Sequence, residues 1–366
     1  MIQHFNSDTP AGRVLVGMSG GVDSSVAALL LMEQGFQVSG ATLRLYDGED
    51  YENKKTKTCC SLSDVEDARS VCDRMGIRHY VFNFKERFER AVIDKFVNSY
   101  QKGLTPNPCI DCNRFIKFSE MLTRAELLDM DYIATGHYAV IRREGDRFLL
   151  ERPRDRAKDQ TYVLYAMTQA QLSKTLMPLG SLTKREVRDF AEEHGFVNAA
   201  KPDSQDICFV PDGDYAGFIA RKIGGFPEGD FVDLSGRVIG RHSGMLRYTV
   251  GQRRGLGMGF GRPLYVVRKN PVTNEVVLGE ESDLYSSRVL VGDVNFIPFD
   301  GLTAPLSCTG KLRYRQNEQP CRIIPLDEHT VLAEFESPQR AVTAGQAAVF
   351  YDGDTVIGGG TILSGE

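Results

Sequence analysis

Short apolar runs alternate with longer amphipathic stretches along the first half of the chain. The apolar runs are bounded by polar residues or glycine, as buried parallel strands are, and they lie at 14–17, 37–45, 79–84 and 132–135. Between them apolar residues recur at helical spacing, as at Val65, Ala68 and Cys72. Strands that alternate with helices predict right-handed βαβ units, and hence a Rossmann-like parallel sheet with helices on both faces.

The pattern changes beyond Asp206, where glycine becomes frequent and short alternating segments replace the amphipathic stretches. From Leu284 onward the chain reads as β-strands separated by turn residues. Six such runs lie at 289–291, 312–314, 322–324, 331–335, 347–351 and 355–358. They predict a small barrel or sandwich.

Composition places the chain among globular proteins, with 42% hydrophobic and 25% charged residues in 366. No apolar run reaches the length of a membrane span and the first residues lack a signal-peptide core, so we expect a cytoplasmic protein without a membrane partner. The formal net charge of −5 argues against a uniformly basic surface. Residues 237–269 nevertheless hold eight basic residues and no acidic one, which suits either phosphate contact or a solvated face.

A glycine-rich turn, Ser19–Ser24, joins the first predicted strand to the first predicted helix. Glycine lets backbone N–H groups approach a ligand, and a helix N-terminus adds partial positive charge, so the turn predicts a phosphate site. It lacks the Walker A ending and the GxGxxG spacing, and it could also be only a tight connection. The stretch GMSGGVDSS resembles the pyrophosphate loop of ATP pyrophosphatases, which cleave ATP to AMP and pyrophosphate. This resemblance implies an ATP site at Gly17, Met18, Ser19, Gly20, Gly21, Val22, Asp23 and Ser24.

Eight cysteines in a reducing compartment are expected to be buried, metal-binding or catalytic. Cys109 and Cys112 follow two prolines and precede a helix expected from about Arg114, whose dipole would favour a thiolate. The pattern favours reactive cysteines over buried thiols, and a structural zinc site would need a second CxxC pair. Cys208 lies where polar residues give way to apolar ones and could be inert or functional. The other cysteines are interpreted as packing residues or as incidental: Cys59, Cys60, Cys72, Cys308 and Cys321.

Seven segments in this order resemble the bacterial tRNA-specific 2-thiouridylase family: SGGVDSS, TPNPCIDCN, IATGHYA, KDQTYVL, SQDICFVP, YTVGQRRGLG and GQAAVFYDGD. They extend across nearly the whole chain. The resemblance implies an adenine nucleotide alpha hydrolase-like fold and ATP-dependent 2-thiolation of the wobble uridine in tRNAs for lysine, glutamate and glutamine. ATP would adenylate uridine O2, and a persulfide sulfur would replace it. The implied division is a catalytic domain at 1–205, a central tRNA-contacting domain at 206–280 and a C-terminal β-barrel at 281–366.

Carried over by motif, Cys208 would hold the persulfide and Cys112 would attack it, leaving a transient Cys112–Cys208 disulfide. Leu43 and Gly136 would contact the adenine nucleotide, and Asp23 or Ser24 could help to hold Mg2+. The residues implied to touch the tRNA anticodon stem-loop are Asn107, Pro108, Cys109, His137, Lys158, Asp159, Gln160, Arg313, Tyr314 and Gln346. Asn107–Cys109 would surround the flipped base. The sulfur would come through persulfide relay proteins from a cysteine desulfurase.

One departure from the family pattern is Cys109, where relatives often have aspartate. If that aspartate is a general acid or base, a thiol could replace it only with a suitable proton affinity. Alternatively, Cys109, Cys112 and Cys208 could bind a 4Fe–4S cluster with one open iron. Two other functions stay open: an adenylating amide ligase of the same superfamily, and a tRNA-binding protein whose loop only stores nucleotide.

Overall fold

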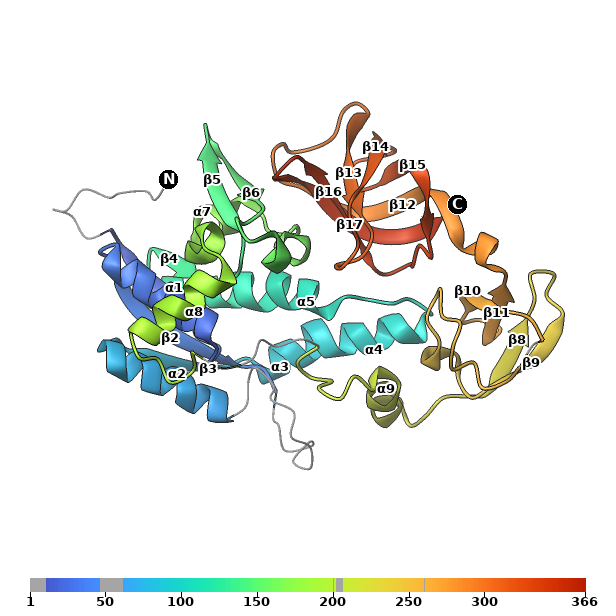
Figure 1. Cartoon of the computed structure of the whole chain (residues 1–366), viewed down its shortest axis with the longest axis horizontal. Helices are drawn as coiled ribbons and strands as arrows, with labels where there is room; N and C mark the ends of the chain where they lie inside the picture. The colour runs from blue at the N-terminus through green and yellow to red at the C-terminus, as the bar shows by residue number, and fades with distance from the viewer. Residues whose placement is uncertain (1–10, 47–61, 200, 202–206, 260) are drawn as a thin grey trace. The chain divides into compact units, whose positions relative to one another are not determined.

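The computed structural model describes residues 11–46, 62–199, 201, 207–259 and 261–366 (Figure 1). Cys59, Cys60 and residues 204–206 of the SQDICFVP segment therefore lie outside the described residues. The chain divides into two compact units. The first consists of 1–92, 109–213 and 354–356, and the second of 93–108, 214–353 and 357–366.

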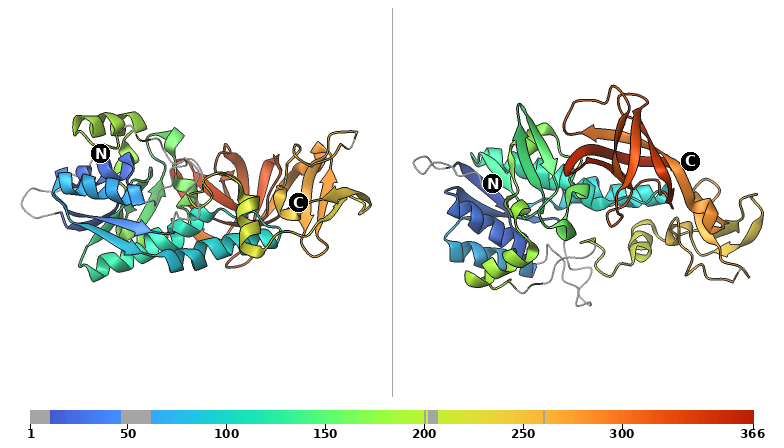
Figure 2. Two further views of the ribbon diagram at one scale, coloured as in Figure 1. Left: turned by 90° about the horizontal axis from the view of Figure 1, so that it is seen from below. Right: turned by 45° about the horizontal axis from the view of Figure 1, so that its top comes forward.

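A parallel sheet forms the centre of the first unit, in the strand order β3-β2-β1-β4-β7 within the described residues (Figure 2). The bounds are β1 Arg13–Gly17, β2 Gln37–Arg44, β3 His79–Asn83, β4 Tyr132–Ala134 and β7 Thr175–Leu176. Four of these strands match the predicted runs. The two-residue β7 was not predicted. The Rossmann-like parallel sheet expected from the sequence is confirmed.

Helices cover both faces of this sheet because successive residues of β1 point to opposite sides. Val14 and Val16 join a buried core with α1 (Val22–Glu33), α2 (Leu62–Met75) and α8 (Lys184–Glu193). On the other face, a Cβ on Gly17 would lie 3.3 Å from Met121 Sδ at the start of α6 (Met121–Leu127). The carboxyl end of β1 therefore leads directly into the glycine-rich turn.

The remaining helical segments are short and often continuous with one another. Their bounds are α3 Lys85–Phe88, η2 Glu89–Ile93, α4 Asp94–Gln101, α5 Pro108–Asp111, η3 Cys112–Glu120, η4 Arg156–Lys158, η5 Thr161–Val163, α7 Gln169–Ser173 and η6 Pro178–Ser181. The helix expected from about Arg114 in fact begins at Pro108, because proline lacks an N–H and its fixed φ suits the first helical position. Cys109 therefore lies in the first turn, and Cys112 lies one turn into the helix.

A hairpin of β5 (Val140–Glu144) and β6 (Arg147–Glu151) completes the first unit together with a return of the chain at 354–356. Thr355 pairs with Glu151 of β6 in an antiparallel register, and the backbone N–H of Arg152 donates to the carbonyl of Asp354 at 3.0 Å. Residues some 200 positions apart thus close the same unit.

The second unit contains a four-stranded sheet and a six-stranded barrel among its described residues. The sheet has the order β10-β11-β8-β9, with β8 Gly229–Val232, β9 Val238–His242, β10 Tyr265–Asn270 and β11 Glu275–Gly279. The helical segments are α9 Tyr215–Ile223, η7 Met245–Arg247 and η8 Glu281–Leu284. No helix in the described part of the chain is long and apolar enough to span a membrane.

The barrel follows the order β12-β15-β14-β13-β16-β17, and pairing of β12 with β17 closes it (Figure 1). Its strands are β12 Tyr285–Phe296, β13 Leu306–Lys311, β14 Gln319–Pro325, β15 Val331–Arg340, β16 Ala347–Asp352 and β17 Thr355–Gly365. The prediction of a strand at 312–314 is wrong. That segment turns, with the Leu312 N–H donating to Gln316 Oε1 at 3.1 Å, and the strand precedes it.

Candidate nucleotide and sulfur-transfer site

The glycine-rich turn lies between β1 and the N-terminus of α1. Gly20 has a φ of +70°, and a Cβ there would come within 2.5 Å of the Asp64 carbonyl, so only glycine fits. Gly21 is the extended N-cap residue of α1, and its carbonyl accepts hydrogen bonds from the hydroxyls of Ser24 and Ser25, each at 3.1 Å. The turn is therefore a rigid loop with its backbone close to the helix N-terminus, as an anion site requires.

Gly136 lies against the end of this loop. A Cβ on Gly136 would come within 2.8 Å of both the Asp23 carbonyl carbon and the Ser24 nitrogen. The turn that follows strand β4 therefore packs directly against the loop. The structure thus brings together Gly136 and Ser19–Ser24, which were both singled out from the sequence. Leu43 is half-buried near the carboxyl end of β2.

Thr42 fixes the start of the loop. Its hydroxyl contacts the Met18 carbonyl and His79 Nε2, both at 2.9 Å. Because a carbonyl only accepts, Thr42 donates to Met18, and His79 Nε2 carries the proton. His79 Nδ1 is buried without a hydrogen-bond partner, and burial together with nearby Arg69 lowers the pKa of this histidine.

The Asp23 carboxylate is fully engaged within the protein. Lys184 Nζ lies 2.7 and 2.8 Å from its two oxygens, and the Tyr138 hydroxyl donates to Oδ1 at 2.8 Å. The lysine side chain is only 11% exposed. Lys184 is the first residue of α8, beside the cap formed by Thr183 and Glu186, and sequence reasoning missed its contact with Asp23.

Two further residues that sequence reasoning missed contact the carbonyl of Gly20. Asn198 Nδ2 donates to it at 3.1 Å, and Lys201 Nζ donates to it at 3.2 Å. Lys201 also contacts Asp64 and Asp67 at 2.6 and 2.8 Å. Burial acts against the charged lysine, but these two carboxylates raise its pKa above the ordinary value.

The cysteines singled out from the sequence all belong to the first unit. Cys109 is exposed, Cys112 is 8% exposed, and Cys208 is half-buried. The Cys208 carbonyl accepts a hydrogen bond from the Tyr46 hydroxyl at 2.8 Å, and the neighbouring Phe209 ring packs edge-on against Phe88. The backbone at Cys208 is therefore anchored to the end of β2 and to α3.

No group of three metal-ligating side chains is placed to hold one ion within the described ranges. Cys109, Cys112 and Cys208 accordingly do not form a three-thiolate site in this arrangement. Cys72, read as a core residue, is buried among α2 and β2 residues, and burial raises the pKa of its thiol to about 12. Cys308 and Cys321 face each other on β13 and β14, with their sulfurs 3.6 Å apart.

Of the residues implied to touch tRNA, five lie in the first unit: Cys109, His137, Lys158, Asp159 and Gln160. His137 is buried, with Nδ1 2.8 Å from the Thr135 hydroxyl, and burial holds its pKa well below the ordinary value. Asp159 accepts hydrogen bonds from the backbone and hydroxyl of Thr161, and Gln160 Oε1 accepts from the Tyr138 N–H at 2.8 Å. Asp159 and Gln160 therefore shape the segment beside Tyr138.

The second unit holds Asn107, Pro108, Arg313, Tyr314 and Gln346. Arg313 donates to the Ala341 carbonyl, and Tyr314 is 41% exposed on the same turn. Gln346 Nε2 donates to the Thr105 carbonyl at 2.8 Å, two residues before Asn107. The structure thus brings Gln346 close to the segment that leads to Asn107 and Pro108.

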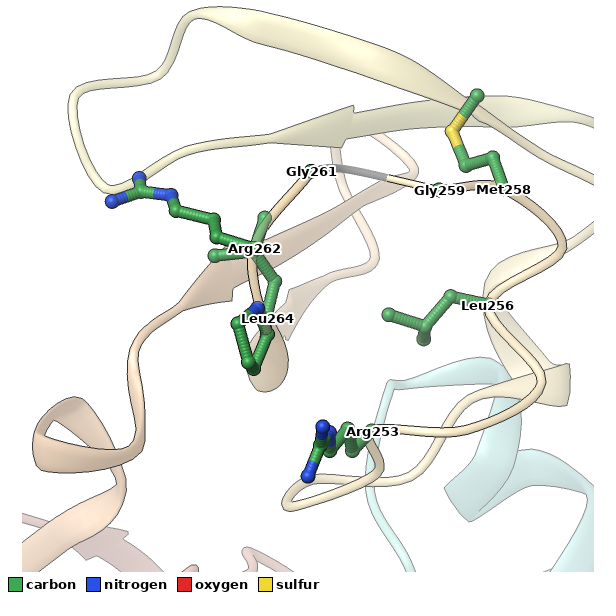
Figure 3. A pocket seen from close by; sticks show the side chains of 8 residues that line it. Arg253, Leu256, Met258, Gly259, Gly261, Arg262 and Leu264 are labelled. Atoms are coloured by element: carbon green, nitrogen blue, oxygen red, sulfur yellow. The ribbon is translucent and has the colours of Figure 1, made fainter.

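Part of the basic stretch 237–269, from Arg253 to Leu264, lines a hollow of about 400 Å³ in the second unit (Figure 3). Two arginines, Arg253 and Arg262, border it, and Leu256, Pro263 and Leu264 give it an apolar lining. Arg262 is paired with Glu280 at 2.7 Å on an exposed surface. Cationic groups around an apolar floor suit a nucleotide, whose phosphate and base need both.

Three family models match consecutive parts of the chain. Their descriptions are tRNA methyl transferase HUP domain at residues 12–212, tRNA methyl transferase PRC-barrel domain at 216–280 and aminomethyltransferase beta-barrel domain at 286–362. A tRNA-specific 2-thiouridylase of Clostridium botulinum is 50% identical over 354 residues, covering 96% of this chain and 99% of that one. The enzyme of the same name from Acetivibrio thermocellus is 51% identical, again with 96% and 99% coverage. With half of its residues shared along nearly its whole length, the chain belongs to the tRNA-specific 2-thiouridylase family.

Proposed function

We propose that this protein uses ATP to replace O2 of the tRNA wobble uridine with sulfur. The observation that carries the proposal is one compact unit that contains the rigid glycine loop at the edge of β1 together with Cys112 and Cys208. The loop supplies backbone donors for a polyphosphate, and the cysteines supply sulfur chemistry. An amide ligase would need only the loop.

The proposed reaction has two stages. Uridine O2 attacks the α-phosphorus of ATP, pyrophosphate leaves, and O2 becomes part of a good leaving group. The terminal sulfur of a Cys208 persulfide then attacks C2, and AMP leaves with the former O2. The Cys112 thiolate finally attacks the Cys208 sulfur, which releases the thiolated uridine and forms the Cys112–Cys208 disulfide. A thiol reductant must return two electrons before the next turnover.

Mg2+ normally accompanies ATP, and the family resemblance implies Asp23 or Ser24 as its ligands. Both oxygens of Asp23 already lie within 2.8 Å of the Lys184 ammonium, and such a carboxylate does not fit a Mg2+ ligand unless the lysine moves. Asp23 instead holds Lys184 beside the loop, where the ammonium can face phosphate.

Sulfur supply is proposed to be a persulfide delivered by relay proteins from a cysteine desulfurase, with the 4Fe–4S cluster as the competing idea. Cys109, Cys112 and Cys208 are not grouped to hold one ion in the described part of the chain, which does not favour the cluster. Active enzyme that is colourless and free of iron after anaerobic purification would exclude the cluster. Iron that co-purifies in proportion to activity would exclude the persulfide route.

The tRNA is proposed to contact both units. In the first, Lys158 and His137 would lie near the anticodon loop, and in the second Arg313, Tyr314, Gln346 and the arginine-bordered hollow would meet the phosphate backbone. A three-part division at 1–205, 206–280 and 281–366 accompanies this proposal. Because its thiols must be kept reduced between turnovers, we expect the protein to act in the cytoplasm.

Mass spectrometry of the wobble uridine after incubation with ATP, tRNA and a persulfide source tests the proposal. Exchange of oxygen for sulfur and addition of a methyl group change the nucleoside mass by different amounts, so the same spectrum separates thiolation from methyl transfer. Cys208→Ser and Cys112→Ser should each abolish 2-thiouridine while tRNA still binds. Cys308→Ser, a half-buried cysteine of the barrel, serves as the matched control and should stay active. Full thiolation by Cys208→Ser would refute its role, and undiminished ATP turnover in both serine variants would favour an amide ligase.

A further inference from the structure

The carbonyl of Gly20 receives two side-chain donors from one short segment. Asn198 Nδ2 lies 3.1 Å from this oxygen and Lys201 Nζ lies 3.2 Å from it. In a trans peptide the C=O and the following N–H point in opposite directions. Holding the Gly20 carbonyl toward Asn198 and Lys201 therefore turns the Gly21 N–H to the opposite side of the peptide, away from them.

The Asn198 side chain is suited to orienting the loop rather than to stabilising the fold. It is 3% exposed, and its amide nitrogen must face Gly20 because a carbonyl oxygen can only accept. The same nitrogen lies 3.0 Å from the Ser25 hydroxyl, which in turn donates to the Gly21 carbonyl. Its own Oδ1 is buried without a hydrogen-bond partner, which costs stability. Despite this cost, the Asn198 side chain fixes two consecutive peptide groups of the loop.

Lys201 is not placed as a phosphate ligand. Its ammonium contacts Asp64 and Asp67 at 2.6 and 2.8 Å, so two carboxylates offset its charge. Asp64 is 3% exposed and lies in the first turn of α2, and its backbone carbonyl is the atom that excludes a Cβ from Gly20. Lys201 thus joins α2 to the loop through one ammonium group.

We propose that Asn198 and Lys201 are positioning residues for the ATP reaction, which set the orientation of the Gly20–Gly21 peptide so that the Gly21 N–H faces the nucleotide phosphates. This inference rests on the proposed use of the loop for ATP. Neither residue touches the substrate. Their loss should weaken ATP binding and leave the binding of tRNA unchanged.

The test compares Asn198→Ala, Lys201→Met and Lys201→Arg with the full-length wild-type chain. Thermal melts followed by the circular dichroism of the tyrosines confirm that each variant folds. Arg87→Met is the matched control, since it removes a 2.8 Å ion pair with Glu120 in the same unit and does not contact the loop. Equilibrium dialysis measures ATP binding without tRNA, and pyrophosphate release measures KM for ATP and for tRNA.

We expect Asn198→Ala and Lys201→Met to weaken ATP binding and to raise KM for ATP by about tenfold or more, with KM for tRNA within about twofold of wild type. Lys201→Arg should recover most of the loss because it keeps a donor and a positive charge. Folded variants that bind ATP as tightly as wild type would overturn the inference, as would a parallel rise in both KM values. If Lys201→Met does not fold, Asn198→Ala decides, since it leaves no buried charge. The dialysis needs no turnover, so a wild-type chain that fails to thiolate tRNA refutes the proposed reaction and not this inference.

Discussion

At the scale of single residues, the side chains that hold the site come from distant positions. Lys184 reaches Asp23 across 161 residues, and Lys201 reaches Gly20 across 181. Local chemistry predicts the glycine loop and the cysteines, because spacing and residue type already carry their signal. Local sequence does not predict the role of Lys184, because the cap formed by its neighbours Thr183 and Glu186 already accounts for that stretch. It does not predict the role of Lys201 either, because the partners of this lysine are set only by the packing of α2 against the loop.

Lys269 offers a prediction for a single charge. Its Nζ is buried without a hydrogen-bond partner, 5.7 Å from the centre of the Tyr100 ring, and burial lowers its pKa from 10.5 to about 8. Below pH 8 the lysine is protonated both folded and unfolded, and the folded state bears the full cost of the buried charge. Between about pH 8 and 10.5 the unfolded chain binds more protons, so stability rises with pH, and above that range the cost is gone.

Lys269→Met should therefore raise the free energy of unfolding by about 3 kcal/mol at pH 7. The gain should shrink as the pH rises from 8 to 10.5. Urea unfolding at pH 7 and at pH 10 measures both values. A gain that is the same at the two pH values would contradict the buried-charge explanation.

At the scale of elements, long periodic segments were predictable and short or displaced ones were not. The strands β1, β2, β3 and β4 follow from apolar runs flanked by helices. Strand β7, with two residues, is too short to show any periodicity. The misplaced strand at 312–314 shows a different limit, since Leu312 is apolar but its N–H is taken by Gln316 in a turn. The helix begins at Pro108 rather than near Arg114 because a proline suits the first helical position as well as a preceding loop.

The cap of α8 gives a prediction for an element. The Thr183 hydroxyl accepts from the Glu186 N–H, and Glu186 Oε2 accepts from the Thr183 N–H at 2.7 Å. Thr183→Ala should lower the free energy of unfolding by about 1 kcal/mol, the usual cost of losing such a cap. Circular dichroism during urea unfolding measures the change. Thr123→Ala removes a hydroxyl within a helix rather than at its start, and a loss as large in that control would show that the cap is not responsible.

At the scale of the whole molecule, the predicted tRNA contacts are distributed over both units, in a chain with a net charge of −5. A net acidic protein can bind a polyanion only through local concentrations of positive charge. The basic stretch 237–269 and the turn at 313–315 are such concentrations. The sequence locates these two concentrations of charge. It does not show that the 313–315 turn connects strands β13 and β14 of the barrel.

Arg313→Ala should weaken tRNA binding and make it less dependent on salt. A guanidinium carries a permanent positive charge and N–H donors in a fork that matches a phosphate. Loss of one phosphate contact should reduce the slope of log K against log salt by roughly one. Filter binding over a range of salt concentrations measures this slope. Arg322→Ala removes the same charge from an exposed position on β14, and identical slopes for the two variants would remove the 313–315 turn from the tRNA surface.

The return of residues 354–356 to β6 has a consequence for synthesis on the ribosome and for fragment design. Glu151 emerges about 200 residues before its partner Thr355, so the first unit cannot close until almost the entire chain has been translated. A fragment that stops at 213 would leave the edge of β6 without that partner and open to pairing with another chain. A self-contained catalytic fragment must therefore carry the 354–356 segment, for example through a circular permutation that places it next to β6.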